Sequence, residues 1–146
     1  MVFTRNRLPP EIAVHTVEIH MIDQIDHLVL TTTDETACVR FYVEVLGMTL
    51  EQPRPGRKAF RFGSQKIDLQ VKGHELELRA HLPVPGALNL CLLANIPLDE
   101  VIGRLIAMDI PIEEGPVSRK GATSDIRSVY VRDPDLNLIE IAVLAG

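Results

Sequence analysis

The sequence repeats itself, and this repeat limits the possible fold more than any other feature. Aligning His27–Leu30 with Asn89–Leu92 also aligns Val39–Leu46 with Val101–Met108 without a gap. Each copy has the pattern of a β-strand, an amphipathic helix and three further strands. Two such copies account for residues 24 to 143. The repeat therefore predicts an α+β fold built from two βαβββ modules.

The second half of each copy aligns at a different offset, because the second copy has additional residues within Gly115–Ser124. At this offset residues 60–63 fall on residues 130–133, and Gln70 falls on Glu140. Each copy then places one polar side chain in its first strand and another in its last strand. The four are His27, Gln70, Asn89 and Glu140. A two-fold arrangement of the modules would bring these side chains toward one centre.

The stretch Ser128–Ala142 predicts a hairpin, because two strand-like runs flank the turn residues Asp133–Asn137. Alternation along the second run puts Ile139 and Ile141 on one face and Glu140 on the other. Glutamate is a poor strand former, and an isolated charge is seldom fully buried. Glu140 therefore lies either on a solvated face or in a polar pocket, and the repeat favours the pocket.

These features together resemble the vicinal oxygen chelate superfamily, which includes glyoxalase I, bleomycin-resistance proteins and extradiol dioxygenases. The resemblance rests on the double βαβββ order, the opening Ile25-Asp26-His27 and the closing run Asp133–Glu140. It covers residues 22 to 144 and is closest to small glyoxalase-domain proteins, through Arg57–Gly63 and Gln65–Ile67.

The resemblance implies a single domain with one module at residues 22–73 and the other at residues 86–144. Their strands would form a curled mixed sheet around a central cleft, with the helices on the convex face. It also implies a homodimer, since single modules leave sheet edges to be covered. The modules that share a cleft could belong to one chain or be exchanged between two chains.

The resemblance further implies that His27, Gln70, Asn89 and Glu140 bind a divalent metal ion, with Glu140 also acting as the catalytic base. Neutral imidazole is a common metal ligand, and this ligand set indicates Mn, Fe, Ni or Zn without selecting one. The ion would act as a Lewis acid on a small substrate with two adjacent oxygens. Lyase, isomerase and dioxygenase chemistries all fit this arrangement.

A metal-free protein that binds and sequesters a small molecule, as in bleomycin resistance, is the alternative. It is kept open by the two neutral residues among the four predicted ligands. For either function, Arg119 and Lys120 in the stretch Gly115–Ser124, together with Tyr130, are candidates for binding an anionic substrate. A solvated surface loop is an equally good interpretation of that stretch.

Local signals define the start and the end of the first helix and one turn. Thr32 and Glu35 fit a capping box at the start of the first helix, and Gly47 suits its left-handed C-cap. In the turn of the final hairpin, Leu136 stands where the family commonly has glycine. Because leucine is strained at positive φ, we expect this turn to differ locally from that of the family.

Composition excludes several kinds of partner. The formal net charge is −5 and tryptophan is absent, so nothing predicts a surface for nucleic acid. No apolar run is long enough to predict a membrane span. The two cysteines, Cys38 and Cys91, indicate no disulfide framework and favour a cytoplasmic location. Residues 1–21 lie outside the repeat and are predicted to be an extension, in which Ile12–Ile19 could add an edge strand.

Overall fold

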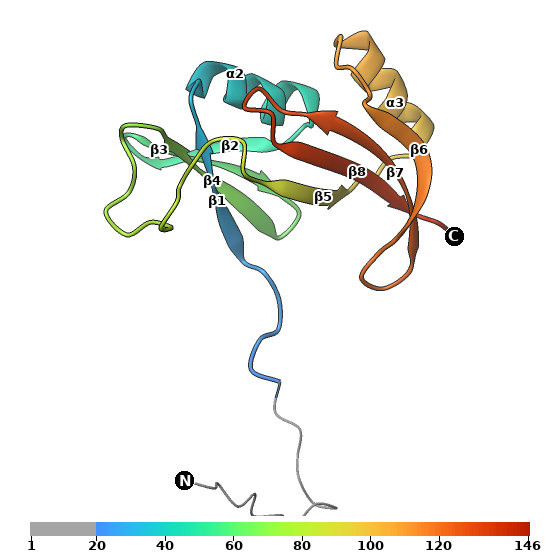
Figure 1. Ribbon diagram of the computed structural model, residues 1–146, viewed down its shortest axis with the longest axis horizontal. Coiled ribbons are helices and arrows are strands. Elements are labelled where there is room, and N and C mark those ends of the chain that lie inside the picture. Colours follow the sequence, from blue (N-terminus) through green and yellow to red (C-terminus); the bar gives the residue numbers. More distant parts are fainter. Residues whose placement is uncertain (1–19) are drawn as a thin grey trace, which may run out of the picture.

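The computed structural model describes residues 20–146, and its elements follow one another twice in the same order (Figure 1). The first module contains β1 (His27–Thr32), α2 (Glu35–Val39), η1 (Arg40–Val45), β2 (Thr49–Arg54), β3 (Arg57–Phe62) and β4 (Gln65–Val71). The second contains β5 (Asn89–Leu93), α3 (Leu98–Ala107), β6 (Glu114–Lys120), β7 (Asp125–Arg132) and β8 (Leu138–Leu144). The predicted βαβββ order is confirmed. The edge strand predicted at Ile12–Ile19 lies outside the described residues.

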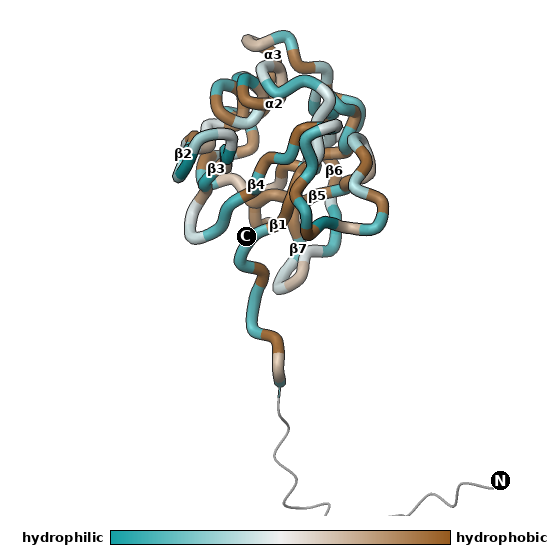
Figure 2. Tube along the Cα trace, turned by 90° about the vertical axis from the view of Figure 1, so that its left-hand side faces the viewer, coloured by the Kyte–Doolittle hydropathy of each residue, from teal (hydrophilic) through white to brown (hydrophobic). Residues whose placement is uncertain are grey.

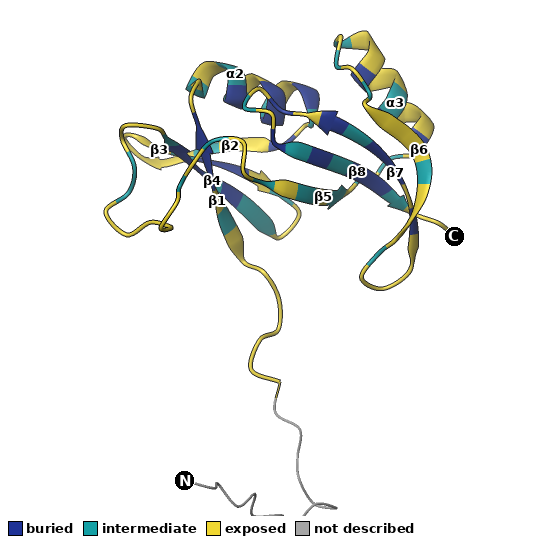
Figure 3. Cartoon of the chain, viewed as in Figure 1, coloured by how far each residue is buried: buried dark blue, intermediate teal, exposed yellow. Residues whose placement is uncertain are grey.

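Each module forms a four-stranded sheet of its own, in the strand orders β1-β4-β3-β2 and β5-β8-β7-β6. In both sheets the first strand runs parallel to the last, and the remaining neighbours are antiparallel. The predicted α+β architecture with mixed pairing is therefore confirmed, with the strands divided between two sheets. The outer strands β2 and β6 are exposed along most of their length, as Figure 3 shows.

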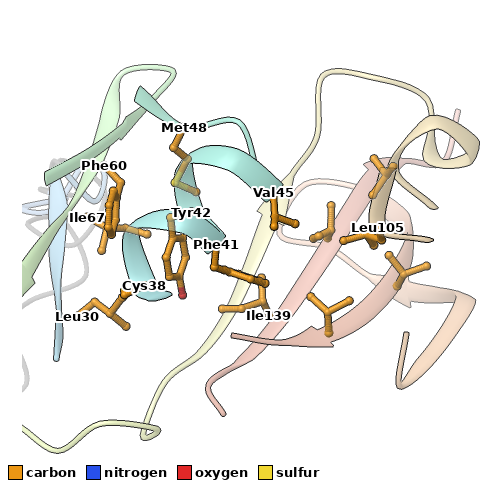
Figure 4. Packing of buried hydrophobic residues seen from close by; sticks show 14 of the residues in the cluster. Leu30, Cys38, Phe41, Tyr42, Val45, Met48, Phe60, Ile67, Leu105 and Ile139 are labelled. Atoms are coloured by element: carbon orange, nitrogen blue, oxygen red, sulfur yellow. The ribbon is translucent and has the colours of Figure 1, made fainter. Parts of the chain in front are cut away.

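The helices lie on one side of the sheets (Figure 1). Buried side chains of both modules form one hydrophobic core. Tyr42 of η1 stacks on Phe60 of β3 with ring centroids 5.1 Å apart, while Leu105 of α3 and Ile139 of β8 belong to the same cluster (Figure 4). Hydrophobic and hydrophilic residues alternate along the strands in Figure 2, as expected for sheets with one packed face. Within residues 20–146, no helix is long and apolar enough to cross a membrane.

The turn of the final hairpin joins the second module to the first through buried polar contacts. Asp133 is 2% exposed and accepts hydrogen bonds from the hydroxyl of Tyr42 and the side-chain amide of Asn137. Asp135 accepts hydrogen bonds from the hydroxyl groups of Thr32 and Thr33 at the end of β1. Because a buried carboxylate is costly unless its oxygens are hydrogen-bonded, this turn stabilises the contact between the modules.

Three local expectations need correction. Asp34, rather than Thr32, is the N-cap of α2, and its side chain accepts from the backbone N–H of Ala37. Leu136 has φ +69°, so the turn keeps the left-handed conformation despite its leucine. The stretch Gly115–Ser124 is mostly strand, because β6 pairs with β7 and backbone pairing overrides its glycine and proline content. Gly47 does adopt positive φ, as its predicted C-cap role requires.

Candidate functional site

The predicted site residues lie on the faces of the sheets that are turned away from the helices. The pairing register of the strands shows which positions of the two modules are equivalent. Val29 of β1 pairs with Asp68 of β4, and at the equivalent place Cys91 of β5 pairs with Glu140 of β8. Asp68, not Gln70, is therefore the structural equivalent of Glu140. The predicted equivalence is wrong because the turns differ in length: residues 63–64 separate β3 from β4, whereas residues 133–137 separate β7 from β8.

His27 begins β1 with a half-exposed side chain that lies between two carboxylates. Its Nδ1 is 2.8 Å from Oδ1 of Asp26, and its Nε2 is 3.7 Å from Oδ2 of Asp68. The hydrogen bond with His27 holds the pKa of Asp26 below its usual value. A proton on Nδ1 would leave the lone pair of Nε2 directed toward Asp68. In metal sites, a carboxylate such as Asp26 commonly accepts a hydrogen bond from the ring nitrogen that does not bind the metal, and this orients the histidine.

Asp68 connects His27 with a nearby cation. Its Oδ1 lies 2.9 Å from Nζ of Lys66, while its other oxygen faces His27. The side chains of Asp68 and Lys66 are 28% and 29% exposed, so the pair lies at an accessible surface. Asp68 therefore presents one oxygen to the imidazole and has the charge of the other partly balanced by the ammonium group.

Gln70 lies elsewhere and has a structural role. It is 4% exposed, its amide nitrogen donates to Oγ1 of Thr31, and its carbonyl oxygen accepts from the backbone N–H of Leu76. The side-chain carbonyl oxygen of Gln70, its only strong acceptor, is thus already bonded to Leu76 in the segment that follows β4. Asp68 replaces Gln70 in the candidate set for this reason and because of the register.

Glu140 lies in the middle of the second sheet, half-buried among polar neighbours. The hydroxyl of Ser128 donates to its Oε2, and Cys91 lies beside it on β5. Burial, followed by the charge of Glu140, raises the pKa of Cys91 to about 11. Tyr130 is directly opposite Glu140 on β7, and Asn89 is exposed at the start of β5 on the same face. The carboxylate is therefore oriented by Ser128 and accessible from the open face.

The predicted anion-binding residues of the second module already have acidic or aromatic partners. Nε of Arg119 donates to the Tyr130 hydroxyl at 3.0 Å, and its guanidinium group also contacts Glu114 and the Tyr130 ring. Lys120 lies 2.8 Å from Asp125, and its side chain is 89% exposed. Arg119 therefore positions the Tyr130 phenol, whereas Lys120 lies in the solvent.

Because Gln70 is engaged by Thr31 and Leu76, the four predicted polar positions do not form one ligand set within a chain. Among the residues that the structure describes, no group of three or more His, Cys, Asp or Glu side chains could hold a metal ion. Glu140 is therefore not beside His27 and Asp68. Two sets of polar side chains occupy equivalent register positions and are called half-sites below: His27 with Asp68 on the first sheet, and Asn89 with Glu140 on the second. An imidazole, two carboxylates and one amide suit the borderline divalent metals.

Comparison with known proteins shows the family to which this fold belongs. Residues 24–141 match the family described as the Glyoxalase/Bleomycin resistance protein/Dioxygenase superfamily. The chain is 48% identical over 122 residues to virulence protein STM3117 of Salmonella typhimurium, covering 84% of this chain and 85% of that protein. The crystal structure of that virulence protein superposes with a TM-score of 0.84, covering 86% of this chain and 100% of the other.

A further curated relative and a further solved structure are also similar to this chain. The glyoxalase domain-containing protein RDO1 of Mycosarcoma maydis is 45% identical over 121 residues, covering 83% of this chain and 68% of that protein. The crystal structure of a lactoylglutathione lyase from Agrobacterium tumefaciens superposes with a TM-score of 0.66 at 26% identity, covering 84% of this chain and 94% of the other.

Proposed function

Because the chain belongs to the glyoxalase/bleomycin resistance protein/dioxygenase superfamily, we propose that it is a metal-dependent enzyme whose active site forms between two copies of the chain. His27 and Asp68 of one copy and Asn89 and Glu140 of the other would hold the divalent ion, which is Mn, Fe, Ni or Zn. The main support is the equivalent register of the two half-sites, which are separate within a single chain.

The sheet edges support a homodimer. β1 and β5 are both edge strands, and each exposes an apolar side chain on its open face. Val29 is 39% exposed and Leu93 is 61% exposed. Unpaired strands with apolar residues favour association with another edge. Pairing β1 of one copy near β5 of the other would cover both residues and bring complementary half-sites together.

A metal ion bound there would supply Lewis-acid chemistry to a small substrate with two adjacent oxygens. The protein side chains would orient and move protons. Ser128 donates to one oxygen of Glu140, which leaves the other oxygen to accept a proton from the substrate. Tyr130 pairs with Glu140 across the strands, and Arg119 donates to its hydroxyl, so the hydroxyl proton would be available for a hydrogen bond to a substrate oxygen. The reaction class would be lyase or isomerase chemistry that begins with proton abstraction.

The cysteines support the proposed cytoplasmic location. Cys38 is buried and Cys91 is exposed, and both are free thiols. Because an exposed free thiol persists best in a reducing compartment, we propose that the enzyme works there.

The test is a set of melting curves with Mn, Fe(II), Ni and Zn added to metal-free protein, combined with light scattering to determine the oligomeric state. A ligand that binds only the folded state raises the melting temperature, and the rise grows with the logarithm of the ligand concentration once this exceeds Kd. The proposal expects a dimer and a rise with at least one ion. A dimer that responds to none of the ions would contradict the enzyme proposal and favour metal-free binding of a small molecule. A protein that is monomeric at micromolar concentration would contradict the shared site.

A further inference from the structure

A hollow of about 190 Å³ lies on the open face of the first sheet, next to Asp68. Its walls include Arg54, Arg57 and Lys66, and Ala59 forms part of its floor. Register places these residues on one face: Arg54 pairs with Arg57, Ala59 pairs with Asp68, and Arg57 and Ala59 are two residues apart on β3. The methyl side chain of Ala59 leaves the space that the longer side chains surround.

The hollow is cationic in a chain that is acidic overall. Four cations line it, because Lys58 is also a lining residue, and Asp68 is the one carboxylate among the lining residues, so its formal charge is 4 − 1 = +3. The formal net charge of the whole chain is −5. Lys66 is already paired with Asp68, and Lys58 is paired with Glu35, which leaves the two arginines as the source of the excess charge.

Within residues 20–146, Arg54 and Arg57 have neither an ion pair nor a side-chain hydrogen bond. Other arginines of the chain do have carboxylate partners: Arg40 with Glu44, Arg61 with Glu51, Arg119 with Glu114, and Arg132 with Glu113. Two like charges directly opposite each other on antiparallel strands destabilise the pairing. The β2–β3 hairpin thus holds an unfavourable charge pair that a bound anion would offset.

We propose that Arg54 and Arg57 form an anion-binding subsite that takes a carboxylate or phosphate group. Guanidinium groups present several N–H donors in a plane and bind both kinds of oxyanion through paired hydrogen bonds. Lys66 adds a third cation beside the arginines and links the subsite to Asp68 through the ion pair at 2.9 Å. The subsite is thus adjacent to the half-site of His27.

This position also defines a class of substrate, an extension that depends on the proposed function. The substrate would carry an anionic group at one end and the two adjacent oxygens at the other. The first sheet would then bind the charged end. The second sheet would contribute Glu140 and the Tyr130 hydroxyl to the reacting end.

The subsite is tested on metal-free protein with inorganic phosphate and, separately, acetate, at constant ionic strength maintained with sodium chloride. Constant ionic strength is needed because salt screens exposed charges. Binding is followed by calorimetry and by the melting temperature. The variants are Arg54→Gln and Arg57→Gln. The matched control is Arg127→Gln, which removes an arginine on the opposite face of the second sheet that has no ion pair within residues 20–146.

The parent is expected to bind at least one of the two anions, and each subsite variant should bind it on the order of tenfold more weakly. Arg127→Gln should bind as the parent does. Without anion, each subsite variant should melt at or above the parent temperature, since the like-charge pair is gone. Binding of phosphate alone would assign a phosphate group, and binding of acetate alone a carboxylate. A parent that binds neither anion, or variants that bind as tightly as the parent, would overturn the proposal.

The outcome is independent of the metal experiment. Anion binding that depends on Arg54 and Arg57 would support the subsite even if no metal ion stabilises the protein. Conversely, a metal response without anion binding would support the proposed enzyme and overturn the subsite.

Discussion

The hydroxyl of Tyr42 donates a hydrogen bond to Oδ2 of Asp133, across 91 positions of sequence, at 2.7 Å. Burial, followed by the charge of Asp133, raises the pKa of Tyr42 far above its usual value, so the hydroxyl remains a donor. The buried phenol of Tyr42 in the first module and the buried carboxylate of Asp133 in the second therefore help to hold the two modules together.

Tyr42→Phe should destabilise the protein by about 1–3 kcal/mol, because Asp133 would remain buried with one donor fewer. Urea unfolding measures this change. The chain's other tyrosine offers a matched control, since Tyr130→Phe removes a hydroxyl bonded to an exposed arginine. That control should cost less than about 0.5 kcal/mol. Equal costs for the two variants would contradict the role of the Tyr42 contact in joining the modules.

Asp68→Asn should abolish most of the metal-dependent rise in melting temperature, because the charge that offsets the cation is lost. Gln70→Met should instead lower the melting temperature of the metal-free protein, since the backbone N–H of Leu76 loses its acceptor. It should leave the rise on metal addition unchanged. Melting curves with and without metal separate these effects. The reverse pattern would restore Gln70 as the ligand.

His27→Ala and Glu140→Gln should each reduce the metal-dependent rise in the dimer, although the two residues are in separate half-sites of one chain. Mixing the two variants provides a sharper test. A mixed dimer would contain one site with both residues intact and one with neither. Because random exchange makes about half of the dimers mixed, metal binding should recover to about one site per four chains. No recovery after subunit exchange would argue against a site shared between chains.

Cys91 should react slowly with iodoacetamide at about pH 8, although it is exposed, because the thiolate is the reactive form. Its pKa of about 11 keeps it protonated there. Glu140→Gln removes a neighbouring charge that raises this pKa, so alkylation should become several-fold faster. Mass spectrometry of the modified chain gives the rate. Cys38 is the internal reference, because burial raises its pKa to about 12. An unchanged Cys91 rate would mean that Glu140 exerts no charge effect on the thiol.

Leu136→Gly should stabilise the protein by up to about 1 kcal/mol. Leucine at φ +69° is strained by roughly 1–2 kcal/mol, part of which the greater freedom of unfolded glycine offsets. Little apolar burial is lost, since Leu136 is 68% exposed. Leu78→Gly is the control, because Leu78 is 93% exposed and lacks positive φ. The control should be neutral or destabilising when compared by urea unfolding.

The repeat was sufficient to predict the order of elements and the face that carries Glu140, because both follow from periodicity. The repeat could not identify Asp68. Matching polar positions in an ungapped alignment does not reveal that the turn between β7 and β8 is longer than the turn between β3 and β4. The repeat predicted a strand between the second helix and the final hairpin, but not that β6 occupies most of Gly115–Ser124, because its pairing with β7 depends on tertiary contacts. The pairing of Arg54 with Arg57 could have been predicted from the sequence. The two residues flank Pro55-Gly56, a typical turn pair that places the residues on either side opposite each other.

The shared hydrophobic core has a consequence for how the chain unfolds. Phe41 and Val45 of the first module lie in the same cluster as Leu105 and Ile139 of the second, so each module alone would expose half of a core. The two modules that the sequence repeat defines are therefore not two independently stable units. A chain cut in the connector at Leu78 should yield two fragments that remain unfolded separately and regain structure only when mixed. The intact protein should lose both halves in a single cooperative transition.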